Sequence, residues 1–234
     1  MHEAPQHIGF IMDGNRRFAR HLMKQALFGH ESGARKIEDV FDWCYEVGTK
    51  YITIYALSIE NLDRPKKEFN FLMNLFEKEF LGVVKNKKIH ERRVKINIIG
   101  RPDLLPKKVQ DAMAKAVLAT EQYDGLFLNI AVAYGGRQEI LDAAAKIAQL
   151  VQSGEIKPDE ITENVFRKNL YINETPDPDL IIRTSGEQRT SGFLLWQGAY
   201  AEYYFSKKCW PEFQKEEFLS AIADFNSRQR RFGK

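Results

Sequence analysis

The sequence predicts a single-domain α/β protein in which helices flank a mostly parallel sheet. Three observations favour this class. Short runs rich in β-branched and aromatic residues recur along the chain, helical patterns separate them, and the 234 residues are 44% hydrophobic and 29% charged, as in ordinary compact domains. We therefore expect residues 1–234 to form one domain with helices on both faces of the sheet.

The expected strands cover residues 7–12, 51–57, 94–99, 126–132 and 179–183, and a weaker sixth run covers 202–205. Between them, apolar residues recur at the spacing of one helix face. These residues are Ile37, Val40, Phe41, Cys44 and Val47, and further along Val109, Met113, Ala116 and Val117. Residues 153–154 and 175–178 are predicted loops inside the domain.

The stretch 66–88 differs from the other predicted helices because its apolar residues cover two faces. Two interpretations fit this pattern. The helix is either buried between the sheet and another layer, or it forms a wall of an elongated apolar cavity.

Charge and cysteine content narrow the function only slightly. The net charge of +3 does not by itself indicate nucleic-acid binding, and we expect none. Cys44 and Cys209 have neither metal-ligand spacing nor a secreted context, and Cys44 fits core packing. No run approaches the ~20 apolar residues of a membrane span, and the first residues lack the order of a signal peptide. We therefore expect a cytoplasmic protein.

Polar residues follow the first strand as Asp13-Gly14-Asn15-Arg16-Arg17-Phe18. In parallel sheets, ligands bind beyond the carboxyl ends of the strands. A glycine and two arginines at a helix start suit phosphate, and the acid suits a Mg²⁺ ion that binds through one carboxylate plus substrate phosphates. A solvated arginine-rich turn is the alternative.

Three further segments follow strands in the same way. Residues 58–65 contain a hydroxyl, acids, an amide and Arg64, which suit a binding site or a simple helix cap. Tyr134-Gly135-Gly136-Arg137 is best explained as a strand-to-helix turn. After the fifth strand, Arg183, Arg189 and Ser191 form a dense anion-binding set, and Glu202 offers a second carboxylate for a metal. The basic tail from Arg228 to Lys234 fits a solvated terminus.

Together these segments resemble the cis-prenyltransferases, the family of undecaprenyl and dehydrodolichyl diphosphate synthases. The resemblance runs from His7 to Gly233 and rests on motifs in order, which include residues 7–17, 28–30, 58–61, 134–137, 179–189 and 193–197. Arg16, where bacterial members usually have glycine, resembles archaeal and eukaryotic members.

The resemblance implies an enzyme that condenses isopentenyl diphosphate with an allylic prenyl diphosphate, releases diphosphate and sets each new double bond cis. It also implies a six-stranded sheet, Mg²⁺ as cofactor, a homodimer and a hydrophobic substrate tunnel. The tunnel favours the cavity-wall interpretation of residues 66–88, with Phe69, Leu72, Met73 and Phe76 as lining. A lipid product suggests peripheral contact with a membrane surface.

Individual roles also follow from the resemblance. Asp13 and Asn61 are the expected catalytic residues, and Asp13 and Glu202 the expected metal ligands. We infer that Asn61 orients the substrate while a diphosphate oxygen takes the proton, because an amide is a poor base. The remaining expected substrate-binding residues are Gly14, Asn15, Arg16, Arg17, Phe18, His30, Ser58, Ile59, Glu60, Leu62, Arg64, Arg183, Arg189, Thr190, Ser191, Arg231 and Gly233.

Four positions depart from the family pattern. Ala26 stands where an arginine usually precedes the histidine of the 28–30 motif, so one diphosphate contact is missing. The others are Leu62, Gln188 and Gly192. These departures favour, as an alternative, an enzyme of altered mode that makes a short or non-head-to-tail product. A non-catalytic subunit of the same fold is disfavoured because Asp13, Arg183, Arg189 and Glu202 are all present. A nucleotide-binding module is also disfavoured, because the sequence has no P-loop or Rossmann glycine fingerprint.

Overall fold

The computed structural model describes residues 4–228 and contains one six-stranded, fully parallel sheet. The strands lie in the order β3-β4-β2-β1-β5-β6. Their bounds are β1 His7–Ile11, β2 Tyr51–Tyr55, β3 Val94–Gly100, β4 Leu126–Val132, β5 Leu180–Arg183 and β6 Glu202–Phe205. All six expected strands are confirmed, and so is the parallel α/β class.

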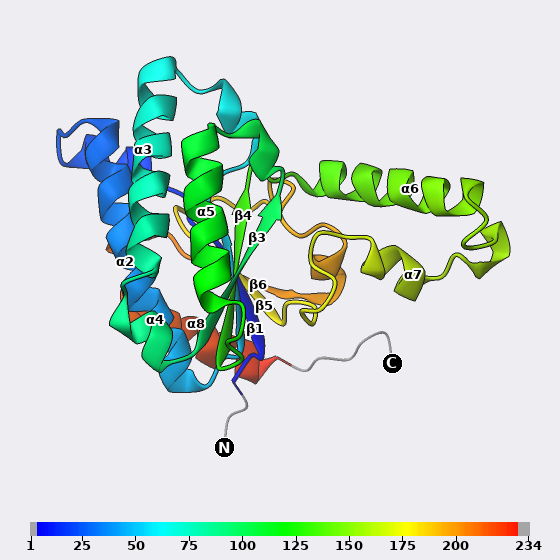
Figure 1. Cartoon of the computed structure of the whole chain (residues 1–234). Coiled ribbons are helices and arrows are strands. Elements are labelled where there is room, and N and C mark those ends of the chain that lie inside the picture. Colours follow the sequence, from blue (N-terminus) through cyan, green and yellow to red (C-terminus); the bar gives the residue numbers. More distant parts are fainter. Residues whose placement is uncertain (1–3, 229–234) are drawn as a thin grey trace.

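Eight α-helices are assigned within the described range (Figure 1). They are α1 Asn15–His21, α2 Ala26–Val47, α3 Lys66–Val83, α4 Lys87–Glu91, α5 Lys107–Thr120, α6 Gly136–Gln152, α7 Glu163–Lys168 and α8 Lys215–Ser227. Within the part of the chain that the structure describes, no helix has both the length and the apolar composition to cross a membrane.

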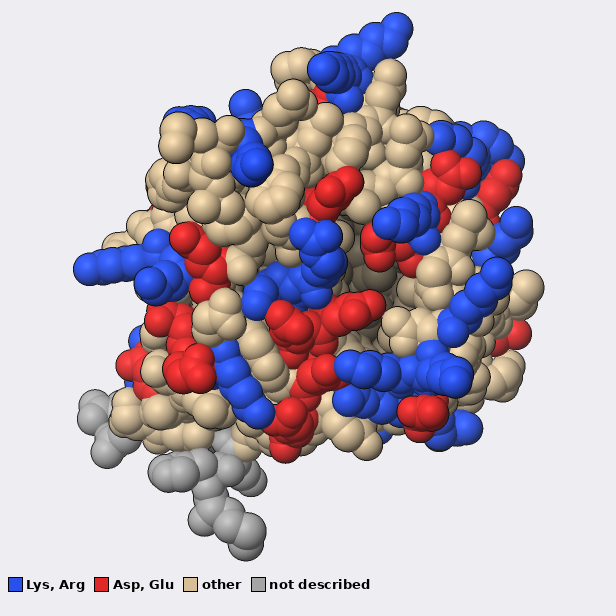
Figure 2. All heavy atoms as spheres, turned by 90° about the vertical axis from the view of Figure 1, so that its left-hand side faces the viewer, with Lys and Arg blue, Asp and Glu red and all other residues tan. Residues whose placement is uncertain are grey.

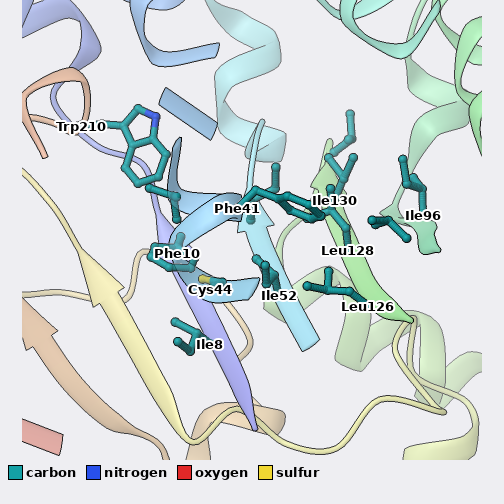
Figure 3. Packing of buried hydrophobic residues seen from close by; sticks show 14 of the residues in the cluster. Ile8, Phe10, Phe41, Cys44, Ile52, Ile96, Leu126, Leu128, Ile130 and Trp210 are labelled. Atoms are coloured by element: carbon teal, nitrogen blue, oxygen red, sulfur yellow. The ribbon is translucent and has the colours of Figure 1, made fainter. Parts of the chain in front are cut away.

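The larger core lies on one face of the sheet, where α2, α3, α5 and α8 pack (Figure 1). Alternate strand residues such as Ile8, Phe10 and Ile52 point into it, because side chains alternate between the two faces of a strand (Figure 3). Cys44 packs there as a fully buried free thiol, as expected. This core holds the helices that border the site rigidly against the sheet.

The opposite face carries a smaller core. Ile181, Phe193, Leu194 and Tyr134 form its centre, and the segment that follows β5 supplies much of it. Helix α6 projects away from the sheet, with α7 beneath it (Figure 1), and Leu141 on α6 is exposed. The expected sheet flanked by helices is confirmed, although α6 extends beyond the sheet (Figure 1).

The single helix expected over 66–88 is wrong at its end. Helix α3 stops at Val83, and α4 begins after Asn86, whose side chain accepts hydrogen bonds from the amides of Lys88 and Ile89. Gly82 and an asparagine cap explain the break, because glycine weakens a helix and asparagine favours a new helix start.

Candidate active site

The site lies where the sheet topology changes direction. The chain runs from β1 to β2 on one side, and later returns to place β5 on the other side of β1. Asp13 follows β1, and Arg183 is the last residue of β5. The crevice outside such a switch point is where open parallel sheets bind ligands.

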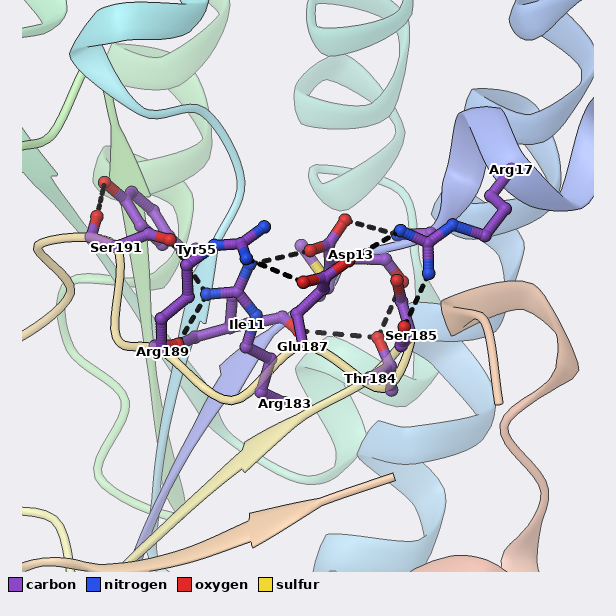
Figure 4. A network of polar contacts seen from close by, with 12 residues as sticks. Ile11, Asp13, Arg17, Tyr55, Arg183, Thr184, Ser185, Glu187, Arg189 and Ser191 are labelled. Atoms are coloured by element: carbon purple, nitrogen blue, oxygen red, sulfur yellow. Dashed lines mark hydrogen bonds and ion pairs between the residues drawn. The ribbon is translucent and has the colours of Figure 1, made fainter. Parts of the chain in front are cut away.

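Asp13 and Arg183 join the two strands through a short ion pair (Figure 4). Arg183 Nη2 donates to Asp13 Oδ2 at 2.7 Å, and the Gly14 amide donates to Oδ1 at 2.7 Å. Arg183 Nη1 donates to Ser191 Oγ at 2.8 Å and to the Arg189 carbonyl at 2.5 Å. Arg183 is only 3% exposed, and its Nε has no partner among the described residues. A buried guanidinium with an unsatisfied donor is suited to a ligand oxygen.

Gly14 brings the start of α1 against the loop after β5. Its φ of 101° and the 2.9 Å that would separate an added Cβ from the Cβ of Ser185 both require glycine. Gly14 also occupies the cap position of α1, and with no side chain it leaves the first helical amides to other acceptors.

Arg17 crosses from α1 to the same loop. It donates to the Ser185 carbonyl at 2.6 Å and to Glu187 at 2.8 Å, and Arg189 contacts the other oxygen of Glu187 at 2.6 Å. The hydrogen bond with Glu187 raises the pKa of Arg17, and the same bond lowers the pKa of Glu187. Glu187 therefore holds two cations at the edge of the site.

A second acid, Glu68 on α3, organises the cations on the far side of Asp13. Its Oε1 lies 3.0 Å from His30 Nε2, 2.9 Å from Arg64 Nη1 and 3.9 Å from Arg16 Nε. Burial alone would raise the pKa of Glu68, but the hydrogen bond from His30 and the charges of both arginines lower it overall. Burial lowers the pKa of His30. Glu68 is thus an ionised group that fixes the positions of three basic side chains.

Asn61 is held at both ends of its amide. Its Nδ2 donates to Ser58 Oγ at 2.8 Å, and its Oδ1 accepts from Arg64 Nε at 2.8 Å. An amide oxygen that already accepts from a guanidinium is poorly placed to remove a proton. This geometry fits the expected orienting role.

Two polar cavities meet at Asp13. The smaller one, about 300 Å³, is lined by Met12, Asp13, Gly14, Asn15, Arg16, Arg17, Arg20, His30 and Arg64. The larger one, about 710 Å³, includes Asp13, Tyr55, Ser58, Glu60, Asn61, Arg64, Arg137, Arg183, Thr190 and Ser191 in its lining. Two diphosphate groups could therefore bind side by side, with Asp13 and Arg64 between them.

An apolar cavity of about 270 Å³ continues from the polar ones between α2 and α3, and it shares Met12, Asn15 and His30 with both. Figure 2 shows the face that carries these helices, which is hollowed near its centre and has acidic and basic side chains around the hollow. Of the four residues expected to line a tunnel, Leu72 and Phe76 do so. Phe69 and Met73 are absent from its lining.

Glu202 does not meet Asp13 within one chain, so one chain alone does not bring the two expected metal ligands together, and their shared role stays a prediction. The strand register places Glu202 opposite Leu180, which lies opposite Ile8 at the amino end of β1. Asp13 lies beyond the other end, about 15 Å away at the rise of a strand. Glu202 instead accepts a hydrogen bond from Arg228 at 2.6 Å. The place of Glu202 at the first residue of the expected strand 202–205 already put it at the amino edge of a parallel sheet.

Four other expected binding residues do not line these cavities. They are Phe18, Ile59, Leu62 and Arg189. Phe18 stacks on Phe28, Leu62 packs against the core, and Arg189 acts through its carbonyl and Glu187. Arg231 and Gly233 lie outside the described residues.

Sequence reasoning missed Glu68, Glu187, Tyr55 and Arg137. Glu68 follows Arg64 by four residues, a spacing that pairs charges on a helix and could have revealed it. Arg137 and Tyr55 line the larger cavity, so the Tyr134-Gly135-Gly136-Arg137 turn does more than reverse the chain. Tyr55 donates to the carbonyls of Tyr134 and Ser191 and links this turn to the loop after β5.

Asp13 is the acid best placed to hold a divalent cation. About one third of its side chain is exposed, at the junction of the two polar cavities. One carboxylate together with substrate phosphates is the usual protein environment of Mg²⁺. The residues present therefore fit such an ion.

Comparisons with known proteins agree with this geometry. A family model described as "Putative undecaprenyl diphosphate synthase" matches residues 11–233. The tritrans,polycis-undecaprenyl-diphosphate synthase (geranylgeranyl-diphosphate specific) of Methanopyrus kandleri is 53% identical over 98% of this chain and 85% of that protein. The enzyme of the same name from Pyrococcus horikoshii is 48% identical over 98% and 87%.

Two solved structures share the fold. Lavandulyl diphosphate synthase from Lavandula x intermedia, in complex with dimethylallyl diphosphate, has a TM-score of 0.94 at 37% identity over 99% of both chains. A probable undecaprenyl diphosphate synthase from Campylobacter jejuni has a TM-score of 0.81 at 31% identity over the whole of both chains.

Proposed function

This chain belongs to the undecaprenyl diphosphate synthase family of cis-prenyltransferases, and from that premise we propose that it extends geranylgeranyl diphosphate with successive isopentenyl diphosphate units into a long polycis product. The starter and the product length are taken from the names of the archaeal relatives. Two basic cavities that meet at Asp13 and lead into an apolar cavity carry the proposal, because one reaction needs two diphosphates and room for a prenyl chain.

The smaller polar cavity suits the allylic diphosphate. Arg16, Arg17 and Arg64 supply forked donors, and the cavity shares Met12, Asn15 and His30 with the apolar cavity where the prenyl chain would lie. The larger cavity suits isopentenyl diphosphate, with Arg183, Thr190 and Ser191 on its wall. The unpartnered Nε of Arg183 is the donor that this diphosphate would satisfy.

The chemistry follows from this placement. The allylic C–O bond breaks, and its electrons leave with the diphosphate, whose growing charge the arginines stabilise. The double bond of isopentenyl diphosphate attacks the allylic carbon, a C–C bond forms, and one proton leaves the adjacent carbon. Asn61, fixed by Ser58 and Arg64, orients the isopentenyl group, and a diphosphate oxygen takes the proton.

The cation that we propose at Asp13 is Mg²⁺, which would neutralise charge on the departing diphosphate. The resting ion pair between Asp13 and Arg183 then has a clear consequence. Arg183 would hold the Asp13 carboxylate in place beside such an ion, because it donates to Oδ2 alone and its other donors fix it to Ser191 and the Arg189 carbonyl.

We propose a cytoplasmic homodimer that contacts the membrane surface when it releases its lipid. The projecting helix α6, with Leu141 exposed, supports the presence of a partner surface. The terminal arginine and glycine motif, outside the described residues, is the segment expected to reach the neighbouring copy. Light scattering of the purified protein tests the assembly.

A second candidate is a short or non-head-to-tail product. Ala26, at the start of α2, takes the place of the expected arginine. The structurally similar lavandulyl diphosphate synthase is named for a lavandulyl product. Losing a charged hydrogen-bonding partner typically costs about 1.5–3 kcal/mol of binding. Restoring it with Ala26→Arg should tighten allylic substrate binding if the site otherwise follows the family.

The test supplies Mg²⁺, labelled isopentenyl diphosphate and each allylic diphosphate of 10, 15 or 20 carbons in turn. A ladder of products that ends at one long length and is most efficient with the 20-carbon starter is expected. Products of a single condensation would favour the second candidate. Asp13→Asn is the inactive control.

A further inference from the structure

A cluster of metal-ligating side chains lies outside the described substrate cavities, where α1 ends against the short 3-10 turn Trp210–Glu212. It contains His21, the last residue of α1, together with Cys209 and Glu212. A ring nitrogen, the Cys209 sulfur and a Glu212 carboxylate oxygen all lie within 4.8 Å of one another. Imidazole, thiolate and carboxylate are the three ligand types that Zn²⁺ uses most.

Local structure already holds two of these groups in place. Glu212 Oε2 accepts a hydrogen bond from the Cys209 amide at 3.2 Å, and the Glu212 amide donates to the Cys209 carbonyl at 2.8 Å. Cys209 is buried, and its Cα abuts Gly14. Backbone amides that orient ligand atoms in this way act as the outer shell of a metal site.

The cluster needs only a small adjustment to close around an ion. Tetrahedral bonds of about 2.0–2.3 Å place ligand atoms roughly 3.3–3.8 Å apart, so no pair has to approach by more than about 1–1.5 Å. His21 is exposed, and rotation of its side chain can supply this movement. The positive charge of neighbouring Arg17 is already paired with Glu187.

We propose that His21, Cys209 and Glu212 bind one zinc-like divalent cation, with water as the fourth ligand. On binding, the thiol proton of Cys209 leaves to solvent and a metal–sulfur bond forms. The sulfur and nitrogen ligands distinguish this site from the oxygen environment of Asp13, which suits Mg²⁺. The bound ion joins the end of α1 to the turn that supports Asp13, because the Trp210 amide donates to the Asp13 carbonyl at 2.9 Å.

Cobalt(II) is the probe, since a Co²⁺–thiolate bond gives a charge-transfer absorption in the near ultraviolet. Tag-free protein is expected to bind one Co²⁺ per chain with this absorption, and Zn²⁺ should displace it. Competition with a chromophoric chelator should show Zn²⁺ affinity at least tenfold weaker in His21→Ala, a surface change that leaves the fold intact. The melting temperature of the parent should rise with Zn²⁺ and that of His21→Ala should not.

The two cysteines provide a matched control. Cys209→Ser should abolish the charge-transfer absorption, whereas Cys44→Ser, which removes the thiol buried in the main core, should retain it. The proposal is overturned if Co²⁺ binds without the absorption, if Cys209→Ser keeps the parent's Zn²⁺ affinity, or if no saturable binding occurs.

Discussion

Arg183 concentrates several tasks in one buried side chain. It contacts Asp13, Ser191 and the Arg189 carbonyl, and it keeps one donor unsatisfied. Only a planar guanidinium can make these contacts at once, because lysine is a compact point charge with a different reach. Arg183 therefore has two roles: it positions the loop after β5, and it offers a donor to the ligand.

Arg183→Lys should raise KM for isopentenyl diphosphate at least tenfold, or about 1.4 kcal/mol, with a smaller effect on KM for the allylic substrate. Steady-state kinetics with each substrate varied in turn checks this. Arg93→Lys, which alters an exposed pair with Asp124, is the matched control and should leave both constants unchanged. Equal effects on the two substrates would contradict the assignment of the larger cavity.

Glu68 positions His30 and Arg64 without reaching substrate itself. Glu68→Gln removes its charge while keeping its shape, so the Arg64 cation and the His30 imidazole both lose an ionised acceptor at a side chain that is only 10% exposed. We expect KM for the allylic diphosphate to rise several-fold and the free energy of unfolding to fall by about 1–3 kcal/mol.

Enzyme kinetics and urea unfolding measure these two effects. Glu77→Gln is the matched control on the same helix, since Glu77 pairs with exposed Lys108 and should contribute less than about 1 kcal/mol. If Glu68→Gln had the same KM for the allylic diphosphate as Glu77→Gln, Glu68 would not position the substrate-binding side chains.

At the scale of elements, α2 and α3 form the walls of the apolar cavity. Ala34 on α2 lines this cavity, so Ala34→Leu adds volume where the growing chain would pass. The longest product should become shorter by at least one isoprene unit. Chromatography of extracted products measures this, with Ala114→Leu on the exposed face of α5 as control. An unchanged product length together with a lower rate would show that the growing prenyl chain does not pass Ala34.

The helices also show what local sequence can predict. Runs of β-branched residues identified all six strands, because their pattern is set by neighbours in the chain. The break between α3 and α4 was missed, since the cap at Asn86 is a local side-chain contact that apolar spacing does not show. Strand ends located Asp13 and Arg183, but not Glu202 at the opposite edge. Long-range contacts such as His30 with Glu68 depend on packing that spacing does not show.

At the scale of the whole molecule, stability should depend on pH through His7. This side chain is 1% exposed, and burial lowers its pKa to about 4. Its Nδ1 donates to the Pro176 carbonyl at 2.7 Å, and its Nε2 lies 2.8 Å from Thr53 Oγ1. Below pH 6.5 the unfolded chain takes up a proton that the folded protein does not, so stability falls as pH decreases toward 4. The loss is about 2–3 kcal/mol by pH 4.5.

Urea unfolding at pH 7 and pH 4.5 measures this loss. His7→Gln removes the titrating group, so its free energy of unfolding should be lower at pH 7 but should fall less on acidification than that of the parent. His30 titrates in both proteins and cancels from the comparison. Equal losses in the two proteins would show that His7 does not control the pH dependence.

The central claim is that two diphosphates bind on either side of Asp13 with the prenyl chain between α2 and α3. A crystal structure of the Asp13→Asn variant with Mg²⁺, isopentenyl diphosphate and geranylgeranyl diphosphate tests it most directly. The account predicts one diphosphate near Arg16 and Arg17, the other near Arg183 and Ser191, and the prenyl chain beside Leu72 and Phe76. A prenyl chain on the other face of the sheet, or both diphosphates in one cavity, would contradict it.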